Sequence, residues 1–525
     1  MIHDSTSHLV FKIGELTRHI ANQLVLISPP SAVNLACTCR YLEEPVLSTL
    51  WEKQKSLRTL LEALPDETWR TEEAVWDHKV RDMHLPLAKL EAQVRLYQFR
   101  IVGNPPPEVW DRVRRYASWM RGIRVDEGSA LGEDTVYKLR LNSPPGGWFP
   151  TLQELSWSIT RSNLPYIANL FFSPHLRKVS VSVAWSWDDY GDVLPAIAST
   201  ISVLPAIAIQ HLLVSFNQSR VPWAHFQDSF SSVVLRCGRS LTHFTSPIPL
   251  SDAAINHLIQ LPRLRTLRIE QCAPPGSSAL PMPTLFSPLA HLTLGQGAAR
   301  GWLSMFKRVG YGVSTTQDVT PLSKMKESLR ILDAETTTVD VSLTSPIQLF
   351  RNLVSLRVAS PCDPGGNNVQ CTFKLNDDNV AELAMALFQL ESLHLGHTCA
   401  KNTCATTVSC LLPISVCCVK IKILEIPFNT TNIVEDFRTI SEDPRFQEMR
   451  SLPKCPLPCL DVWMIPLDLD GPGFETVAHG LIDIFPSLEY CRGLDVYWDD
   501  ISDRIREFRE RAMNAPSTPS VGVVS

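Results

Sequence analysis

The 525-residue sequence has no large excess of charge of either sign and no long uninterrupted apolar run. Its 49 Lys and Arg residues against 54 Asp and Glu residues give a formal net charge of -5, so the total charge does not favour a nucleic acid or a membrane surface as partner. The first residues, MIHDSTSHLVFKIGELTRHIANQ, lack the apolar centre of a secretory signal, and no apolar run approaches a membrane span. We therefore expect a cytoplasmic or nuclear protein that binds neither nucleic acid nor membrane.

Sequence motifs of catalysis are also scarce. The chain has no Gly-x-Ser-x-Gly elbow and no Gly-rich loop ending in Gly-Lys-Ser/Thr, and GPGFETVAHG lacks the preceding strand and the third glycine of a dinucleotide site. The acidic residues Asp499, Asp500 and Asp503 are more typical of the charged face of a capped helix than of metal ligands. We predict that the chain is not an enzyme and needs no cofactor.

Cysteine is not scarce, but its spacing does not favour a metal site. The 14 cysteines include one rich stretch, formed by Cys399, Cys404, Cys410, Cys417 and Cys418 and followed by Cys455 and Cys459. This stretch lacks the paired two-residue spacings of structural zinc sites, and the only nearby imidazole is that of His397. Without a secretory signal, buried or free thiols are the preferred interpretation, with a bound metal or disulfides as the alternatives. We predict that this group binds no metal.

A short sequence unit recurs along the chain. The stretch LNDDNVAELAMALFQLESLHL (375–395) aligns with LSDAAINHLIQLPRLRTLRI (250–269), and both end in Leu-x-x-Leu-x-(Leu/Ile). In both copies Ser or Asn followed by Asp suits a helix N-terminus, and apolar residues three and four apart predict one buried helix face. The final alternation predicts a short strand. One unit is therefore a helix followed by a strand.

The strand signature by itself occurs about a dozen times, at intervals of roughly 25 to 40 residues that suit leucine-rich repeats. The signatures begin at Met120, Leu152, Leu176, Ile209, Leu264, Leu289, Leu353, Leu390 and Ile421, with weaker copies at Leu241, Leu329 and Leu488. A single helix–strand unit cannot bury its own apolar face, so successive units must stack. The pattern predicts an α/β leucine-rich-repeat solenoid over residues 105–495, with parallel strands on the concave side and helices on the convex side. The alternative is a set of ordinary amphipathic strands with coincident leucines.

The first part of the chain does not follow the repeat. Ile13, Leu16, Ile20, Leu24 and Ile27 fall on one helical face, and the Ser-Pro-Pro that follows is expected to end that helix. A second run places Leu35, Cys39, Leu42, Val46 and Leu50 on one face, directly before Trp51. These helices are too short to have much core of their own, so we expect them to pack on a partner or on the next helix.

These patterns divide the chain into five parts. We expect a small helical module over residues 9–61, a helical linker over 62–104, the solenoid over 105–495, and a C-terminal helix over 496–513. Residues 514–525 contain PSTPSVGVVS, which has too few large apolar residues to pack, so we expect a disordered tail there.

The segment HIANQLVLISPPSAVNLACTCRYLEEPVLSTLWEKQKSLRTLLEAL resembles the F-box-like domain of a large fungal family of F-box and leucine-rich-repeat proteins. The residues that carry the match are Asn34, Leu35, Ala36, Cys39, Arg40, Pro45, Leu50 and Trp51. The segment NPPPEVWDRVRRYASWMRGIRV is similar to the part of that family that leads into the first repeat, so the resemblance spans nearly the whole chain. One departure is that LVFKIGEL stands where an F-box usually opens with Leu-Pro.

The resemblance implies a substrate receptor of an SCF-type ubiquitin ligase. In such a complex the F-box helices bind a Skp-family adaptor, the adaptor binds a cullin scaffold, and the repeats hold a protein target. The residues expected to contact the adaptor are Leu35, Leu42, Val46, Leu50 and Trp51. The alternative is a non-catalytic repeat scaffold whose N-terminal helices only cap the solenoid. Exposed apolar residues on those helices would favour the receptor, and complete burial against residues 120–125 would favour the scaffold.

Overall fold

The computed structural model describes most of the chain in two compact units, Met1–Ala254 and Ile255–Ser525. The described residues are 4–38, 40–73, 97–125, 131–159, 170–183, 202, 208–216, 224–270, 288–295, 298–311, 323–336, 338–359, 372–396, 404–444, 447–448, 452–463, 467, 469, 471–493 and 496–514. The expected solenoid span, 105–495, includes parts of both units, and the expected disordered tail lies outside the described residues except for Asn514.

Unit 1 begins with helices and continues with strands and helices in alternation. Its elements are α1 (Asp4–Ile27), α2 (Pro29–Thr38), α3 (Arg40–Glu52), β1 (Lys53–Gln54), α4 (Leu57–Leu61), η1 (Asp66–Thr68), β2 (Trp69–Glu73), β3 (Tyr97–Ile101), α5 (Pro107–Trp119), β4 (Gly122–Val125), α6 (Glu133–Leu141), β5 (Glu154–Ile159), β6 (Lys178–Val183), β7 (His211–Phe216), α9 (Ala224–Arg236) and β8 (His243–Ser246).

Helices α1, α2 and α3 pack together as an N-terminal helical cluster. The first helix ends at Ile27, as predicted, and Pro29 opens the next one, where a missing backbone N–H costs no hydrogen bond. The core of the cluster is small, and it consists of Ala21, Ala32, Ala36 and Val46, surrounded by the half-buried Leu24, Val25, Leu35, Leu42, Leu47 and Leu50. Small alanines at the centre let the three helices approach one another closely, but they bury little apolar area.

The segment between the helical cluster and the main sheet differs from the helical linker expected over residues 62–104. Its described part contains β2 and β3, which pair antiparallel. Aromatic and β-branched residues favour this pairing, since Trp69 stacks on Phe99 with 5.0 Å between ring centroids and Ile101 is buried. Cross-strand contacts of this kind join residues that are distant in sequence, so helical spacing alone did not predict them.

The remaining strands of unit 1 form a parallel sheet in the order β1-β4-β5-β6-β7-β8. Alternate residues of these strands are buried, as the register partners Ile123, Leu155, Val179 and Leu212 show. Each such side chain contributes about 1.5–3 kcal/mol of burial free energy. The strand signatures that begin at Met120, Leu152, Leu176, Ile209 and Leu241 therefore correctly predict β4 to β8.

Unit 2 repeats the same strand–helix alternation. Its elements are α10 (Asp252–Gln260), β9 (Thr266–Ile269), β10 (His291–Leu294), α11 (Ala298–Tyr311), α12 (Ser323–Ser328), β11 (Ile331–Glu335), β12 (Thr338–Val339), α13 (Val341–Ile347), β13 (Ser355–Ala359), β14 (Thr372–Phe373), α14 (Asp377–Ala386), β15 (Ser392–Leu395), η5 (Val408–Cys410), α15 (Leu411–Cys417), β16 (Ile423–Glu425), α16 (Ile433–Glu442), β17 (Cys459–Trp463), α18 (Gly471–Ile484), β18 (Tyr490–Gly493) and α19 (Val496–Asn514).

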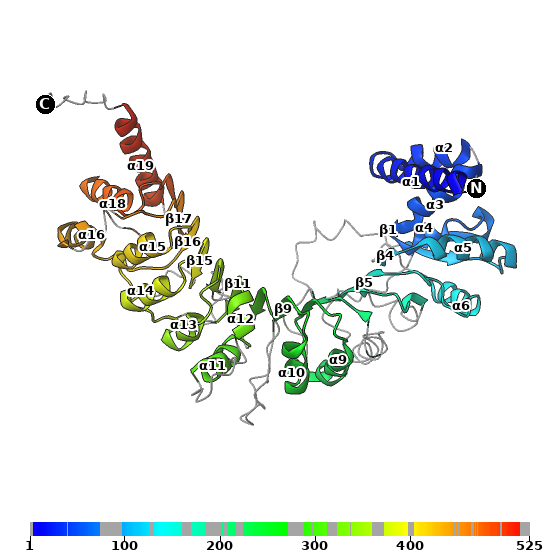
Figure 1. Ribbon diagram of the computed structural model, residues 1–525, viewed down its shortest axis with the longest axis horizontal. Helices are drawn as coiled ribbons and strands as arrows, with labels where there is room; N and C mark the ends of the chain where they lie inside the picture. Colours follow the sequence, from blue (N-terminus) through cyan, green and yellow to red (C-terminus); the bar gives the residue numbers. More distant parts are fainter. Residues whose placement is uncertain are drawn as a thin grey trace. The chain divides into compact units, whose positions relative to one another are not determined.

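The main strands of unit 2 are also parallel, in the order β9-β10-β11-β13-β15-β16-β17-β18. Figure 1 shows α13, α14 and α15 on one side of β11, β15 and β16. The strand signatures predicted all of these strands except β17, where Leu457, Leu460 and Val462 repeat the same spacing and are buried. The α/β class and the large parallel sheet are thereby confirmed.

The two aligned sequence units have the helix starts that their polar residues predict. In the copy at 375–395, the Asn376 side chain accepts a hydrogen bond from the Asn379 backbone N–H, and the Asn379 side chain accepts one from the Asn376 N–H in return. In the copy at 250–269, the Ser251 hydroxyl accepts a hydrogen bond from the Ala254 N–H. At the other end of the chain, α19 occupies the expected terminal helix.

Candidate recognition surface

The parallel sheet of unit 1 has an open face, formed by the strand side chains that are not buried against the helices. Register places these side chains in two rows that cross the strands. The first row consists of Lys53, Glu154, Lys178, His211 and His243, with Gly122 between the first two. The second row consists of Arg124, Ser156, Ser180, Leu213 and Thr245.

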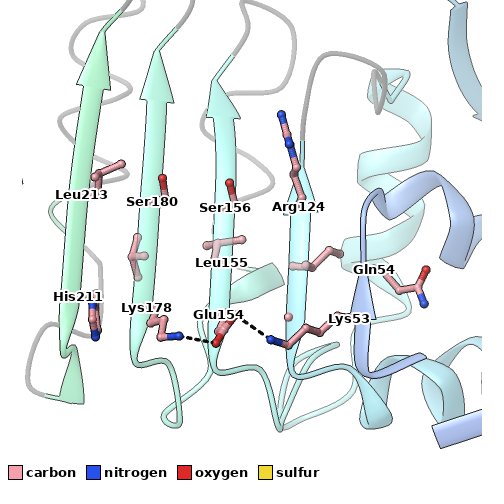
Figure 2. Close-up of a pocket in the computed structure, with 13 residues that line it drawn as sticks. Lys53, Gln54, Arg124, Glu154, Leu155, Ser156, Lys178, Ser180, His211 and Leu213 are labelled. Carbon is pink, nitrogen blue, oxygen red and sulfur yellow. Dashed lines mark hydrogen bonds and ion pairs between the residues drawn. The ribbon is translucent and has the colours of Figure 1, made fainter. Parts of the chain in front are cut away.

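These rows border a shallow hollow with a volume of about 410 Å³, lined by residues of β1, β4, β5, β6 and β7 (Figure 2). Gly122 lies in the first row on β4, so no side chain separates Lys53 from Glu154 there. As Figure 2 shows, Glu154 lies between the two lysines. Strand β1, which directly follows α3 of the helical cluster, contributes Lys53 and Gln54 to the lining of this hollow.

The Glu154 carboxylate lies between the two lysines of the first row and contacts both. Its Oε1 accepts a hydrogen bond from Lys178 Nζ at 2.8 Å, and its Oε2 lies 3.6 Å from Lys53 Nζ. The hydrogen bond from Lys178, aided by the charge of Lys53, lowers the pKa of Glu154 below its ordinary value against the opposing effect of burial. Glu154 is therefore an anion at neutral pH, and the hollow contains this carboxylate together with the cations Lys53, Arg124 and Lys178.

Two histidines extend the first row on neighbouring strands. The rings of His211 and His243 are stacked, with centroids 4.1 Å apart and planes inclined by 9°. Burial, followed by the charges of His243 and Lys178, lowers the pKa of His211, so this imidazole is neutral at pH 7. The sequence shows each histidine beside a strand leucine, but only the register between β7 and β8 brings the two rings together.

The open face of unit 2 has a different charge pattern, in which acids and bases pair across adjacent strands. Arg357 Nη1 lies 3.2 Å from Asp333 Oδ1, and His394 Nδ1 lies 2.7 Å from Glu425 Oε2. Burial, followed by the charge of Asp333, raises the pKa of Glu335. On this face Arg357 is therefore matched by a carboxylate on the adjacent strand, and the His394 ring contacts another.

The side chains of the five residues predicted to contact an adaptor are buried or half-buried. Val46 is fully buried and Trp51 is 9% exposed, while Leu35, Leu42 and Leu50 are half-buried around the core of the helical cluster. Trp51 stacks on Tyr116 of α5 with ring centroids 4.7 Å apart. Their role as contact residues stays a prediction, but the buried members already have intramolecular partners.

Other apolar side chains of the same cluster do face solvent. Leu16, Ile20 and Ile27 of α1 are 59%, 45% and 79% exposed. At 100° per residue these three fall within about 40° of arc, so they form one strip, called the α1 strip below. The sequence pattern identifies them as part of an apolar face, but not which edge of that face remains uncovered: Leu24 from the same pattern packs on the cluster core.

The cysteines of the rich stretch are distributed among helices, strands and turns. No group of three or more His, Cys, Asp or Glu residues within the described ranges is arranged to hold a metal ion. Burial raises the pKa of Cys404 to about 11 and that of Cys418 to about 12. Cys399 and His397 lie outside the described residues. Among the described helices, none is both long and apolar enough to cross a membrane.

Comparison with known proteins adds no family to this geometry. No protein-family model matches the chain, and no curated protein sequence is significantly similar to it.

Proposed function

We propose that the chain is a substrate receptor of an SCF-type ubiquitin ligase. The helical cluster binds a Skp-family adaptor, the adaptor binds a cullin scaffold, and the open strand faces bind a protein target. The observation that supports this proposal most directly is the α1 strip, because a chain that only needed a helical cap would have no use for a solvent-exposed apolar edge. The resemblance to F-box-like sequences supports the same division of roles.

The α1 strip has the chemistry of a helix that docks in an apolar groove. Its three side chains have the helical spacing of groove anchors, and burying each would contribute about 1.5–3 kcal/mol. In this proposal the strip and the half-buried Leu35, Leu42 and Leu50 form the adaptor contact, while Val46 and Trp51 support it from inside. The absent Leu-Pro start is compensated by contacts of α1 itself.

The test is co-purification of the full-length chain with a Skp-family adaptor and a cullin. Replacing Leu16 and Ile20 together with Asp should abolish capture of the adaptor, because two charges would have to be desolvated at the interface. Val46 is unsuitable for this test: an Asp there would bury a charge in the cluster core and unfold it.

A matched control uses the same helix and the same four-residue spacing. Arg18 and Asn22 are exposed on the other side of α1, and replacing both with Asp also adds two carboxylates. This control should capture the adaptor as well as the unmodified chain does. If the folded, unmodified chain captures no adaptor, the ligase proposal fails.

The second candidate function is a repeat scaffold without an adaptor. The observation that favours it is the burial of Trp51 against Tyr116 and the pairing of β1 with β4, through which the helical cluster covers the first edge of the unit 1 sheet. In that case the Leu16 and Ile20 replacements should leave every interaction of the chain unchanged, whereas replacements on the open faces should weaken target binding.

A further inference from the structure

We propose that Ser143, in the loop between α6 and β5, is a phosphorylation site for a proline-directed protein kinase, and that Arg114 and Arg140 hold the phosphate. The reaction transfers the γ-phosphoryl group of ATP to the Ser143 Oγ. The Oγ–P bond forms, the bond between this phosphorus and the ADP oxygen breaks, and the hydroxyl proton passes to the base of the kinase. This inference goes beyond the proposed function and does not depend on it.

Most of the described serines that precede a proline are closed to a kinase. Five such serines lie in the part of the chain that the structure describes: Ser28, Ser143, Ser173, Ser246 and Ser345. Ser173 and Ser246 are buried, and both hydroxyls donate to backbone carbonyls. Ser345 lies inside α13 between the buried Thr344 and Pro346. A kinase that binds its substrate as an extended segment would have to unpack the core to reach any of these three.

Ser28 and Ser143 differ in their surroundings. Ser28 is the single residue between α1 and α2, and its Oγ lies 2.9 Å from the Ser31 Oγ. Extending the chain around Ser28 would therefore unwind two helices of the helical cluster. Ser143 has a helix on one side only, and its hydroxyl makes no hydrogen bond with the described chain. Ser143 is therefore the more accessible of the two.

The loop that contains Ser143 has few contacts with the rest of the chain. A Cβ added at Gly146 or Gly147 would meet no heavy atom within 4 Å. Gly147 has a φ of 79°, which lets the chain turn so that its N–H donates to the Pro144 carbonyl at 2.9 Å. On the other side Leu141, the last residue of α6, is 66% exposed. Opening the last turn of α6 therefore loses little packing.

Pro144 selects the class of kinase. Proline has no backbone N–H, and it favours an extended conformation of the residue before it. A kinase groove without an acceptor for the N–H that follows the serine prefers Ser-Pro, because any other residue there would bury an unpaired donor. A proline-directed kinase therefore fits this site.

Two arginines beside the loop have unused donors. Arg114 of α5 donates from Nη1 to Asp111 Oδ1 at 2.7 Å and from Nη2 to the Asn142 carbonyl at 3.1 Å. That carbonyl belongs to the peptide bond between Asn142 and Ser143, so the guanidinium lies beside the serine. A guanidinium has five donors, and the Arg114 Nε is buried without a partner in the described chain. The exposed Arg140, whose carbonyl accepts a hydrogen bond from the Ser143 N–H at 3.2 Å, has no ion pair with the described residues.

These guanidinium groups suit the product of the reaction. A phosphoserine carries a charge of about -1.5 to -2 and three strong acceptor oxygens, which arginine donors bind well. By contrast, no Lys or Arg lies within three residues of Ser28 in the sequence. A phosphate on Ser143 would therefore tie the loop to α5 and to the end of α6.

The first experiment incubates the full-length protein with ATP, Mg²⁺ and a recombinant mitogen-activated protein kinase, and follows each site by quantitative mass spectrometry. The references are free peptides of residues 137–149 and 22–34, which contain the same Ser-Pro motifs without the fold. Ser143 in the protein should react within about threefold of the rate of its peptide, and Ser28 at least about tenfold more slowly than its peptide, because two helices must open. Equal slowing at both sites, or no reaction at Ser143, would overturn the proposal.

Two neighbouring prolines provide a matched pair of variants. Pro144→Ala should slow the reaction at Ser143 about tenfold, because alanine brings an N–H that the kinase groove leaves unpaired. Pro145→Ala, one position further along the same loop, should leave the rate unchanged. Equal rates in the two variants would contradict a proline-directed kinase.

The second experiment tests the arginines by ³¹P NMR of the phosphorylated protein. Nearby guanidinium groups favour the dianion, so the phosphate should titrate about 0.5 pH lower than in the phosphorylated peptide 137–149. Arg114→Gln and Arg140→Gln should each raise this midpoint. The control is Arg112→Gln, which removes an exposed arginine of the same helix α5 and should leave the midpoint unchanged. A midpoint that neither of the first two variants changes would refute the arginine contacts.

Adaptor capture separates this site from the proposed function. Ser143→Ala should capture the Skp-family adaptor as well as the unmodified chain does. If the unmodified chain captures no adaptor but is phosphorylated at Ser143 as described, the phosphorylation site stands and the ligase role does not.

Discussion

Trp51 lies between the helical cluster and α5, with its indole stacked on Tyr116. Because the indole is almost fully buried, Trp51→Ala should lower the free energy of unfolding by about 3 kcal/mol, and Trp51→Phe by less. Urea unfolding followed by circular dichroism measures both changes. The control is Tyr41→Ala in the same helix: Tyr41 is 90% exposed, so its loss should change stability by less than about 0.5 kcal/mol. Equal effects of the two alanine variants would contradict the burial of Trp51.

Gly480 of α18 is a position where the backbone approaches a neighbouring aromatic ring. A Cβ atom at this residue would overlap the ring of Phe437 on α16. Although alanine is the better helix former, Gly480→Ala should therefore destabilise the protein by about 1–3 kcal/mol, seen as a lower melting temperature. Gly471→Ala is the control, since no heavy atom lies within 4 Å of its added Cβ. A higher melting temperature for Gly480→Ala would show that α16 and α18 are farther apart.

The buried thiol of Cys418 should make stability depend on alkaline pH. Burial raises the pKa of Cys418 from the ordinary 9.0 to about 12, so above pH 9 the unfolded chain loses a proton that the folded chain keeps. The contribution of this thiol is fully present below pH 9 and is lost as the pH rises toward 12. At pH 10 the loss is about 1.4 kcal/mol.

Urea unfolding of the unmodified chain and of Cys418→Ala at pH 8 and pH 10 measures this effect. The variant loses the thiol's packing at both pH values, so the informative quantity is the change in unfolding free energy between them. That change should be smaller in the variant by about 1.4 kcal/mol. An identical pH dependence in both proteins would mean that the Cys418 thiol ionises as readily in the folded chain as in the unfolded chain.

At the scale of elements, the Asp377 side chain connects α14 of unit 2 to the helical segment that follows it, although the sequence predicts that Asp377 helps to cap α14. Asp377 follows the helix cap Asn376 and is expected to help cap α14, but its carboxylate accepts hydrogen bonds from both the backbone N–H and the hydroxyl of Thr407, each at 2.7 Å. Thr407 in turn caps η5. The acid at the start of one helix therefore positions the start of the next helical segment.

Asp377→Ala should destabilise unit 2 by about 1–3 kcal/mol, because it leaves the Thr407 donors without this acceptor. The control is Asp378→Ala, which removes an exposed acid from the same first turn of α14. Hydrogen exchange should show faster exchange of the amides in η5 and α15 for the first variant only. Equal exchange in both variants would show that the link to Thr407 carries no stability.

Elements with a strong local signal were predictable, and those that depend on distant partners were not. The Leu-x-x-Leu-x-Leu spacing predicted β4 to β8 because the same residues that make each strand also bury it. The pair of β2 and β3 was missed, since its stability comes from the stacking of Trp69 on Phe99 across a long stretch of chain. β17 was missed although Leu457, Leu460 and Val462 carry the spacing, because a cysteine- and proline-rich context obscures it.

At the scale of the molecule, the sequence predicted on which face the candidate site lies but not which side chains form it. Stacking of helix–strand units predicts that one face of the strands stays open, but the chemistry of that face depends on register. The sequence separates Lys53, Glu154 and Lys178 widely, and only the order β1-β4-β5-β6 brings them into one row. For the proposed adaptor contact, the sequence identified apolar helix faces but could not assign Val46 to the core and Leu16 to the surface.

The short strand β1 has a practical consequence for dissecting this protein. The end of α3 continues directly into β1, and the Glu52 carbonyl accepts a hydrogen bond from the Arg121 N–H at 2.8 Å just before β1 pairs with β4. A repeat-only fragment beginning after residue 61 would lose this strand and leave β4 as an unpaired edge, which invites association between copies. Fragments for expression should therefore begin before α3, and an aggregating shorter fragment would reflect its chosen boundary rather than an inability of the repeats to fold.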